Sequence, residues 1–156
     1  MNAFVNVFYD WSRAIASLFT WLAPLAARIT VGVVFAQTGW LKLHALPRMI
    51  ENFREWGIPA PEFFTPLASG IEFVGGLMLL FGLLTRFAAV PLMIVMVVAI
   101  VSAKLGDIDS LVTLLGFEEV SYFVMFAWLA IAGPGPVSLD HFILQAADRD
   151  PVDHGA

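Results

Sequence analysis

The feature that most constrains this sequence is a series of apolar stretches that are almost free of charge. Four of them follow one another, over about residues 22–42, 67–84, 87–104 and 118–133. A helix needs about 20 mainly apolar residues to cross a hydrocarbon core of roughly 30 Å. Three stretches come close to that length and the fourth is shorter. We therefore predict an all-α integral membrane protein, built as a four-transmembrane-helix bundle in one domain over residues 1–156.

The overall composition supports lipid as the solvent of this fold. Hydrophobic residues make up 60% of the chain and charged residues only 13%, against about 45–50% and 25% in soluble domains. A chain of 156 residues with that composition leaves too much apolar surface for water. It has no cysteine, which excludes disulfides, iron–sulfur clusters and thiol redox chemistry. Its net charge of -5 provides no basic surface for nucleic acid.

The segments outside these stretches also carry structural signals. Aromatic and aliphatic residues recur at helical spacing over residues 3–20, which predicts a short amphipathic helix at the membrane interface. A second short helix is expected over residues 47–56, and residues 134–156 are expected to form a polar tail. Four spans place the N and C termini on the same side. Lysine and arginine are shared equally between the two sides, so the positive-inside rule leaves the orientation open.

Ionisable residues within the spans are the strongest functional signal. Each costs on the order of 2.5–3.5 kcal/mol on insertion scales, so such groups usually face inward and are paired. Threading the four spans alternately through the membrane divides them between its two faces. One face receives Lys42, His44, Glu72, Lys104, Glu118 and Glu119, and the other receives Arg28, Arg86 and Asp140.

Glu72 is the most informative of these residues. Its neighbours three and four residues away are all small, and small residues allow another helix to approach. Gln37 lies at a similar depth on the first span, so we predict a polar pocket that contains Gln37, Lys42, Glu72 and Lys104. In this pocket Glu72, Lys42 and Lys104 are candidate proton-handling catalytic residues. An equally open interpretation is that Glu72 and a lysine form a structural ion pair that fixes helix register.

The remaining polar residues receive more limited roles. His44 and Glu119 lie at the same face as the predicted pocket and are, with Gln37, candidate substrate-binding residues. Arg28, Arg86 and Asp140 are expected to form a structural polar cluster at the other face, since arginines near span ends readily reach the interface. No histidine lies inside a span, so we expect no bis-histidine haem, no metal site and no intrinsic cofactor.

Three short motifs resemble those of the DoxX family. Gly39 and Lys42 match a G-x-x-K ending of the first span, and Glu72 with Gly75-Gly76, Gly82 and Arg86 is similar to the family's second span. The stretch Gly133-Pro134-Gly135 with Ser138-Leu139-Asp140 resembles its closing motif. The likeness covers about residues 23–144, and the three motifs occur in the family's order at the matching helix ends.

The resemblance implies a small four-span protein of the bacterial inner membrane that is associated with quinones and membrane oxidoreductase complexes. A membrane quinone would then be the ligand of the pocket. Lys42 or Lys104 would donate a hydrogen bond to a carbonyl oxygen, Glu72 would exchange a proton, and Gln37 would orient the head group. Electrons would come from a partner, since the chain shows no cofactor site of its own.

Two further functions fit the sequence. The chain could be a non-catalytic structural or assembly subunit of a larger membrane complex or a homo-oligomer, with its short amphipathic helices as docking surfaces. It could also be a carrier for protons or small solutes, since carriers use intramembrane acids. The sequence shows no inverted repeat and no pair of broken helices, which are the usual signs of alternating access.

Overall fold

The structure, a computed structural model, describes residues 2–149 and, within them, the side chains of residues 7–15 and 17–146. Helices account for 84% of the chain, and residues 2–149 contain no strand. The all-α prediction is therefore confirmed. The helices are α1 (Asn2–Leu18), α2 (Leu22–His44), α3 (Leu46–Glu55), α4 (Pro61–Phe81), α5 (Thr85–Ala99), α6 (Leu111–Gly116), α7 (Glu118–Ala132) and α8 (Leu139–Arg149). A π-helical turn, η1 (Ile100–Lys104), and a 3-10 turn, η2 (Leu105–Asp107), continue α5.

Three helical segments are long and apolar enough to cross a membrane. They are α2, α4 and the continuous stretch Thr85–Asp107, which comprises α5 with η1 and η2. The fourth predicted span corresponds to α7, which has 15 residues. At 1.5 Å per residue that is only about 22 Å, short of the roughly 30 Å of a hydrocarbon core. The fourth span therefore stays a prediction.

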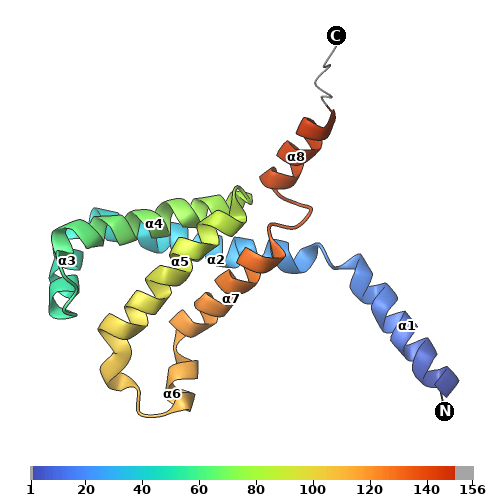
Figure 1. The fold of residues 1–156 in the computed structure, drawn as a ribbon, viewed down its shortest axis with the longest axis horizontal. Coiled ribbons are helices and arrows are strands. Elements are labelled where there is room, and N and C mark those ends of the chain that lie inside the picture. Colours follow the sequence, from blue (N-terminus) through green and yellow to red (C-terminus); the bar gives the residue numbers. More distant parts are fainter. Residues whose placement is uncertain (1, 150–156) are drawn as a thin grey trace, which may run out of the picture.

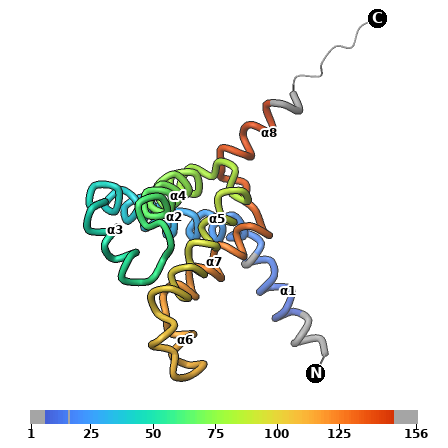
Figure 2. Tube along the Cα trace, turned by 60° about the vertical axis from the view of Figure 1, so that its left-hand side comes forward, coloured from blue at the N-terminus to red at the C-terminus, as the bar shows by residue number. Residues whose placement is uncertain are grey.

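The closest packing in the bundle joins α2 to α4, which lie side by side (Figures 1 and 2). Glycines on both helices allow this approach. A Cβ atom on Gly32 would lie 2.8 Å from the backbone nitrogen of Leu80, and on Gly39 or Gly76 it would also run into the backbone of the opposite helix. In lipid, helices associate through such close van der Waals contact because burial from water no longer drives them together.

The second helix pair is formed by α5 and α7, which cross α2 and α4 at an angle (Figure 1). Phe35 of α2 lies between the two pairs. Its ring meets those of Tyr122 and Phe126 edge to face, with centroids 5.1 and 4.9 Å apart, which is a favoured aromatic geometry. The buried core around this contact comprises Val31, Phe35, Leu79, Ala88, Ala89, Leu92, Met96, Phe126 and Leu129.

The outer surface of the bundle is apolar. Large hydrophobic side chains are exposed along all four helices, among them Val33, Val74, Phe87, Ile94, Val124 and Ile131. A soluble monomer rarely exposes contiguous apolar surface of this kind, whereas a membrane protein presents it to acyl chains. The bundle is thus built for contact with the lipid bilayer.

The two ends of the bundle differ in what they carry. Both α1 and α8 leave from the end where α4 turns into α5, which we call the terminal end (Figures 1 and 2). The short helices α3 and α6 lie at the opposite end, which we call the loop end. The residues 134–156 that were predicted as a polar tail include helix α8, and residues 150–156 lie outside the described part.

Candidate functional site

An ion pair between Lys42 and Glu72 lies in the half of the bundle toward the loop end. Glu72 points from α4 toward α2 and is only 3% exposed. The Lys42 ammonium nitrogen lies 2.7 Å from each of its carboxylate oxygens. The ammonium group donates a hydrogen bond to Oε1 and is ion-paired with Oε2 as well. The close approach of the helices at Gly39 explains why the two side chains meet so directly.

A second ion pair joins the other helix pair. The Lys104 ammonium nitrogen lies 2.7 Å from both carboxylate oxygens of Glu119 on α7. It also lies 5.0 Å from the centroid of the Phe117 ring, within range of a cation–π contact. Lys104 ends the π-helical turn η1, and π-helical turns inside α-helices often occur at functional sites.

A cavity of about 170 Å³ opens between the two helix pairs. Its lining residues come from α2, α4, α5 and α7: Val34, Phe35, Thr38, Lys42, Glu72, Met96, Ala99, Glu118, Glu119 and Tyr122. Apolar side chains form one part of the wall and ionisable side chains another. The cavity therefore brings both ion pairs, through Glu72 and Glu119, to one space between the helix pairs.

The structure brings together some of the predicted site residues and separates others. Lys42, Glu72 and Glu119 line the cavity, and Lys104 adjoins it through its pair with Glu119. Gln37 is exposed on α2 and His44 is exposed beside Trp40, and neither lines the cavity. Five residues separate Gln37 from Lys42, which corresponds to about 140° of rotation around a helix of 3.6 residues per turn. Two residues at a similar depth in the membrane can therefore lie on different faces of the helix.

Thr38 and Tyr122 line the cavity without having been predicted to. Thr38 precedes Lys42 by four residues and so shares its helix face, which is a signal the sequence contained. Tyr122 follows Glu118 by the same interval on α7. Its position depends on how α7 packs against Phe35, and the sequence does not give that contact.

The terminal end holds the second predicted cluster. Arg28 is 1% exposed, and its guanidinium donates a hydrogen bond to the carbonyl oxygen of Val137. It lies so close over Gly82 that a Cβ atom there would overlap it. Among the described residues no ion pair within 4 Å joins Arg28 to Asp140. Arg86 is exposed and packs along Gly133, where an added Cβ would lie 3.1 Å from its Nε.

Asp140 instead caps the N-terminus of α5. Its carboxylate accepts hydrogen bonds from the backbone nitrogens of Leu84 and Thr85, at 2.8 and 3.2 Å. Its own backbone nitrogen donates to the carbonyl oxygen of Gly82 at 3.0 Å. The first amides of a helix have no partner within it, and a carboxylate there also suits the helix dipole. Asp140 thus ties the first turn of α8 to the hairpin between α4 and α5.

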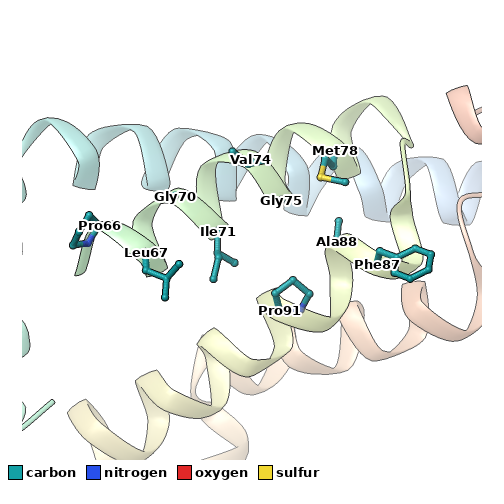
Figure 3. Close-up of a pocket in the computed structure, with 10 residues that line it drawn as sticks. All are labelled: Pro66, Leu67, Gly70, Ile71, Val74, Gly75, Met78, Phe87, Ala88 and Pro91. Carbon is teal, nitrogen blue, oxygen red and sulfur yellow. The ribbon is translucent and has the colours of Figure 1, made fainter. Parts of the chain in front are cut away.

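An apolar groove of about 440 Å³ lies where α4 and α5 diverge (Figure 3). It is lined by Pro66, Leu67, Gly70, Ile71, Val74, Gly75 and Met78 of α4 and by Phe87, Ala88 and Pro91 of α5. None of these side chains is polar. The groove suits a hydrocarbon chain and offers no group for chemistry.

The described residues contain no group of three or more histidine, cysteine or acidic side chains that could hold a metal ion. The candidate chemistry therefore rests on the two ion pairs and the cavity between them.

An apolar exterior, three membrane-length helices and buried ion pairs define a small helical integral membrane protein. More specifically, the chain belongs to the DoxX family, whose family model matches residues 23–105. The expected family membership is thereby confirmed.

Three bacterial proteins are similar to the chain, and two of them are named as membrane proteins. It is 36% identical to the uncharacterized membrane protein Rv3486 of Mycobacterium tuberculosis, over 79% of this chain and 82% of that protein. It is 27% identical to CatD of Bacillus subtilis, which is provisionally named an oxidoreductase, over 84% and 94%. It is 29% identical to the inner membrane protein YqjF of Escherichia coli, over 76% and 90%. No solved structure matches the chain.

Proposed function

We propose that this protein is the quinone-linked component of a membrane oxidoreductase assembly. The observation that supports this most is the ion pair of Lys42 with the buried Glu72, whose two residues line a cavity of about 170 Å³ between the helix pairs. Intramembrane ionisable groups are expensive to bury and usually serve a function. The provisional naming of the relative CatD as an oxidoreductase agrees with this class of activity.

In this proposal the ion pair manages protons at the head group. Reduction of a quinone takes up two electrons and two protons, and oxidation of the hydroquinone releases them. The electrons pass to or from a redox partner in the assembly. Lys42 donates a hydrogen bond to the ligand oxygen, and Glu72 accepts or returns one proton there, since acid–base catalysis requires a titratable group within hydrogen-bond reach.

The test is to purify the tagged protein from its native membranes in mild detergent and to identify the proteins and quinones that accompany it. We expect a redox enzyme to co-purify and quinone to be retained. Glu72→Gln should abolish the quinone-dependent activity of the assembly, while Glu55→Gln, an exposed carboxylate on α3, should leave it unchanged. Full activity in a well-folded Glu72→Gln protein would contradict the role of Glu72.

A second candidate is a non-catalytic assembly subunit, and the position of α1 favours it. This helix projects away from the bundle (Figure 1). Large side chains on the helix and on the turn after it are exposed, and Phe8, Trp11 and Phe19 have exposed fractions of 62%, 63% and 54%. Such a helix suits either the membrane interface or a partner subunit. Stoichiometric co-purification with a redox enzyme, without quinone on this chain, would favour this candidate and leave Lys42–Glu72 as a structural tie.

We further propose that α7 is the fourth span and that both termini lie on one side of a bacterial inner membrane. The departure of α1 and α8 from the same end of the bundle supports this. Because the chain has no cysteine, single-cysteine variants can be labelled with a membrane-impermeant maleimide in intact cells and in inverted vesicles. Ser12→Cys and Gln145→Cys should label from one side and Gly106→Cys from the other. Labelling of Gln145→Cys from the same side as Gly106→Cys would show that α7 does not cross the membrane.

A further inference from the structure

The bundle consists of two units that follow one another in the sequence. Residues 22–81 form the α2–α4 unit, which includes α3, and residues 85–132 form the α5–α7 unit, which includes η1, η2 and α6. Each unit is a pair of helices closed at the loop end by its own short helix. The only covalent link between the two units is the segment of residues 82–84, which lies at the terminal end.

Each unit satisfies its own charges toward the loop end. Lys42 pairs with Glu72 inside the α2–α4 unit, and Lys104 pairs with Glu119 inside the α5–α7 unit. Among the described residues, no hydrogen bond or ion pair joins one unit directly to the other. Separation of the units at the loop end would therefore break neither ion pair.

Polar contacts do tie the units together at the terminal end, through the segment that follows α7. Arg28 of α2 donates a hydrogen bond to the carbonyl oxygen of Val137. Asp140 accepts hydrogen bonds from the backbone nitrogens of Leu84 and Thr85, at the link between the units. The covalent link and these polar contacts thus fix the same end of the bundle.

The buried apolar residues between the units are also concentrated toward the terminal end. Leu79 lies near the end of α4, Ala88 near the start of α5 and Leu129 near the end of α7. Toward the loop end the described core stops at Phe35 and Met96, and the cavity of about 170 Å³ follows. In lipid, close packing and polar bonds hold helices together, because burial from water does not. The loop half of this interface has a cavity where the terminal half has a core.

The helices diverge in the same direction. The short helices α3 and α6, which close the two units, lie apart in both views (Figures 1 and 2). The apolar groove of about 440 Å³ lies where α4 and α5 diverge (Figure 3). The two units are therefore joined at one end and spread apart at the other.

From these features we infer that the two units move as rigid bodies about a hinge at residues 82–84, and that their separation at the loop end opens the cavity to its ligand. Hinges are usually a few loop residues between packed elements. A rotation of about 10° would move the far end of α7, which is about 22 Å long, by about 4 Å. This inference goes beyond the proposed function, because it applies to any ligand of the cavity.

The motion can be tested by double electron–electron resonance on the full-length protein in lipid nanodiscs, because the chain has no cysteine and spin labels can be placed freely. Labels at Phe63→Cys and Ser121→Cys measure the separation of the units toward the loop end. Phe81→Cys with Ile131→Cys measures it at the terminal end, and Leu41→Cys with Phe63→Cys measures a distance within the α2–α4 unit. All of these positions are exposed. We expect the loop-end distances to spread over about 4 Å more than either control.

The opening of the cavity can be tested by the labelling rate of Thr38→Cys, which lies in the cavity wall. The ring of Phe35 packs against Tyr122 and Phe126 of the other unit, so Phe35→Ala should favour the separated state. Labelling by N-ethylmaleimide should become at least about fivefold faster in that background, from the loss of two aromatic contacts. Phe53→Ala, which removes a ring from α3, should leave the rate unchanged.

The wild-type distances decide the motion even if Phe35→Ala does not fold. Loop-end distances as narrowly distributed as those within the α2–α4 unit would overturn the hinge. An equal spread at both ends would also overturn it, because the units would then separate without a pivot. An unchanged labelling rate of Thr38→Cys in a folded Phe35→Ala protein would overturn the opening of the cavity.

Discussion

At the terminal end of the bundle Arg28 is buried with its guanidinium against a backbone carbonyl, whereas toward the loop end Glu72 is buried with its carboxylate against a cavity. The charged groups of the terminal end are used by the chain itself. Arg28 binds Val137, and Asp140 binds two amides of the α5 start. Those of the loop end form two ion pairs, Lys42–Glu72 and Lys104–Glu119, beside one cavity.

This difference shows that burial alone does not identify a functional charge in a membrane helix. Arg28 is as deeply buried as Glu72, but its guanidinium contacts the backbone and lines neither the cavity nor the apolar groove. Glu72 and its partner Lys42 do line the cavity. The two ends can therefore be distinguished by removing one charge at a time.

The largest effect is expected for Lys42→Met. The substitution leaves Glu72 buried without its cation, and breaking a buried pair typically destabilises a protein by about 3–5 kcal/mol. Thermal unfolding in detergent should show a marked loss of stability. The double variant Lys42→Met/Glu72→Met removes both charges and should recover most of it. A single variant as stable as the wild type would show that water reaches Glu72 freely.

A somewhat smaller loss is expected for Arg28→Met at the terminal end. The hydrogen bond from the buried guanidinium to the carbonyl of Val137 is lost, and a hydrogen bond to a charged group contributes about 1.5–3 kcal/mol. Thermal unfolding in the same detergent measures the loss. Because no direct ion pair ties Arg28 to Asp140 within the described residues, adding Asp140→Asn should not restore stability. Rescue by that second substitution would contradict the contrast between the two ends.

Asp140→Ala should have an effect of about 1–2 kcal/mol. The first amides of α5 lose their acceptors, and loss of a helix cap usually costs this much. The measurement is thermal unfolding beside the control Asp107→Ala, an exposed carboxylate at the end of η2. Equal stability of the two variants would show that Asp140 does not hold the start of α5.

The smallest effect is expected for Lys104→Met. The carboxylate that it leaves behind is the more exposed of the two, at 14% for Glu119 against 4% for Glu72. Water can hydrate Glu119 better, so we expect a loss of at most about 1 kcal/mol. A double-mutant cycle with Glu119→Gln measures the coupling directly. A coupling energy as large as that of Lys42 with Glu72 would mean that both pairs are equally shielded from water.

The sequence predicted the division of charges between two ends because alternating spans fix the depth of each residue. It predicted the close approach near Glu72 because small residues mark such contacts. It did not separate Lys42 from Lys104 as the partner of Glu72, because depth says nothing of which helices are neighbours. The same limit explains Gln37, whose depth fits the site but whose side chain lies on the exposed face of α2.

The terminal arrangement was predicted only as a set of residues. The sequence grouped Arg28, Arg86 and Asp140 by charge, and opposite charges suggested pairing. The backbone groups that Arg28 and Asp140 bind carry no sequence signal, since every residue has them. Which amides and carbonyls lie free depends on where α5 begins and how the chain approaches α8.

The π-helical turn η1 ends at Lys104, so the direction of this ammonium group depends on the number of residues in that turn. A π-helical turn contains one more residue than the α-helical turn it replaces, so η1 acts as a one-residue insertion in the helix. Deleting one residue from 100–103 would restore an α-helix and leave Lys104 facing in nearly the same direction, because the π-helical turn accommodates that one extra residue. A relative can therefore keep the pair with Glu119 without a π-helical turn, provided that it has one residue fewer before its lysine.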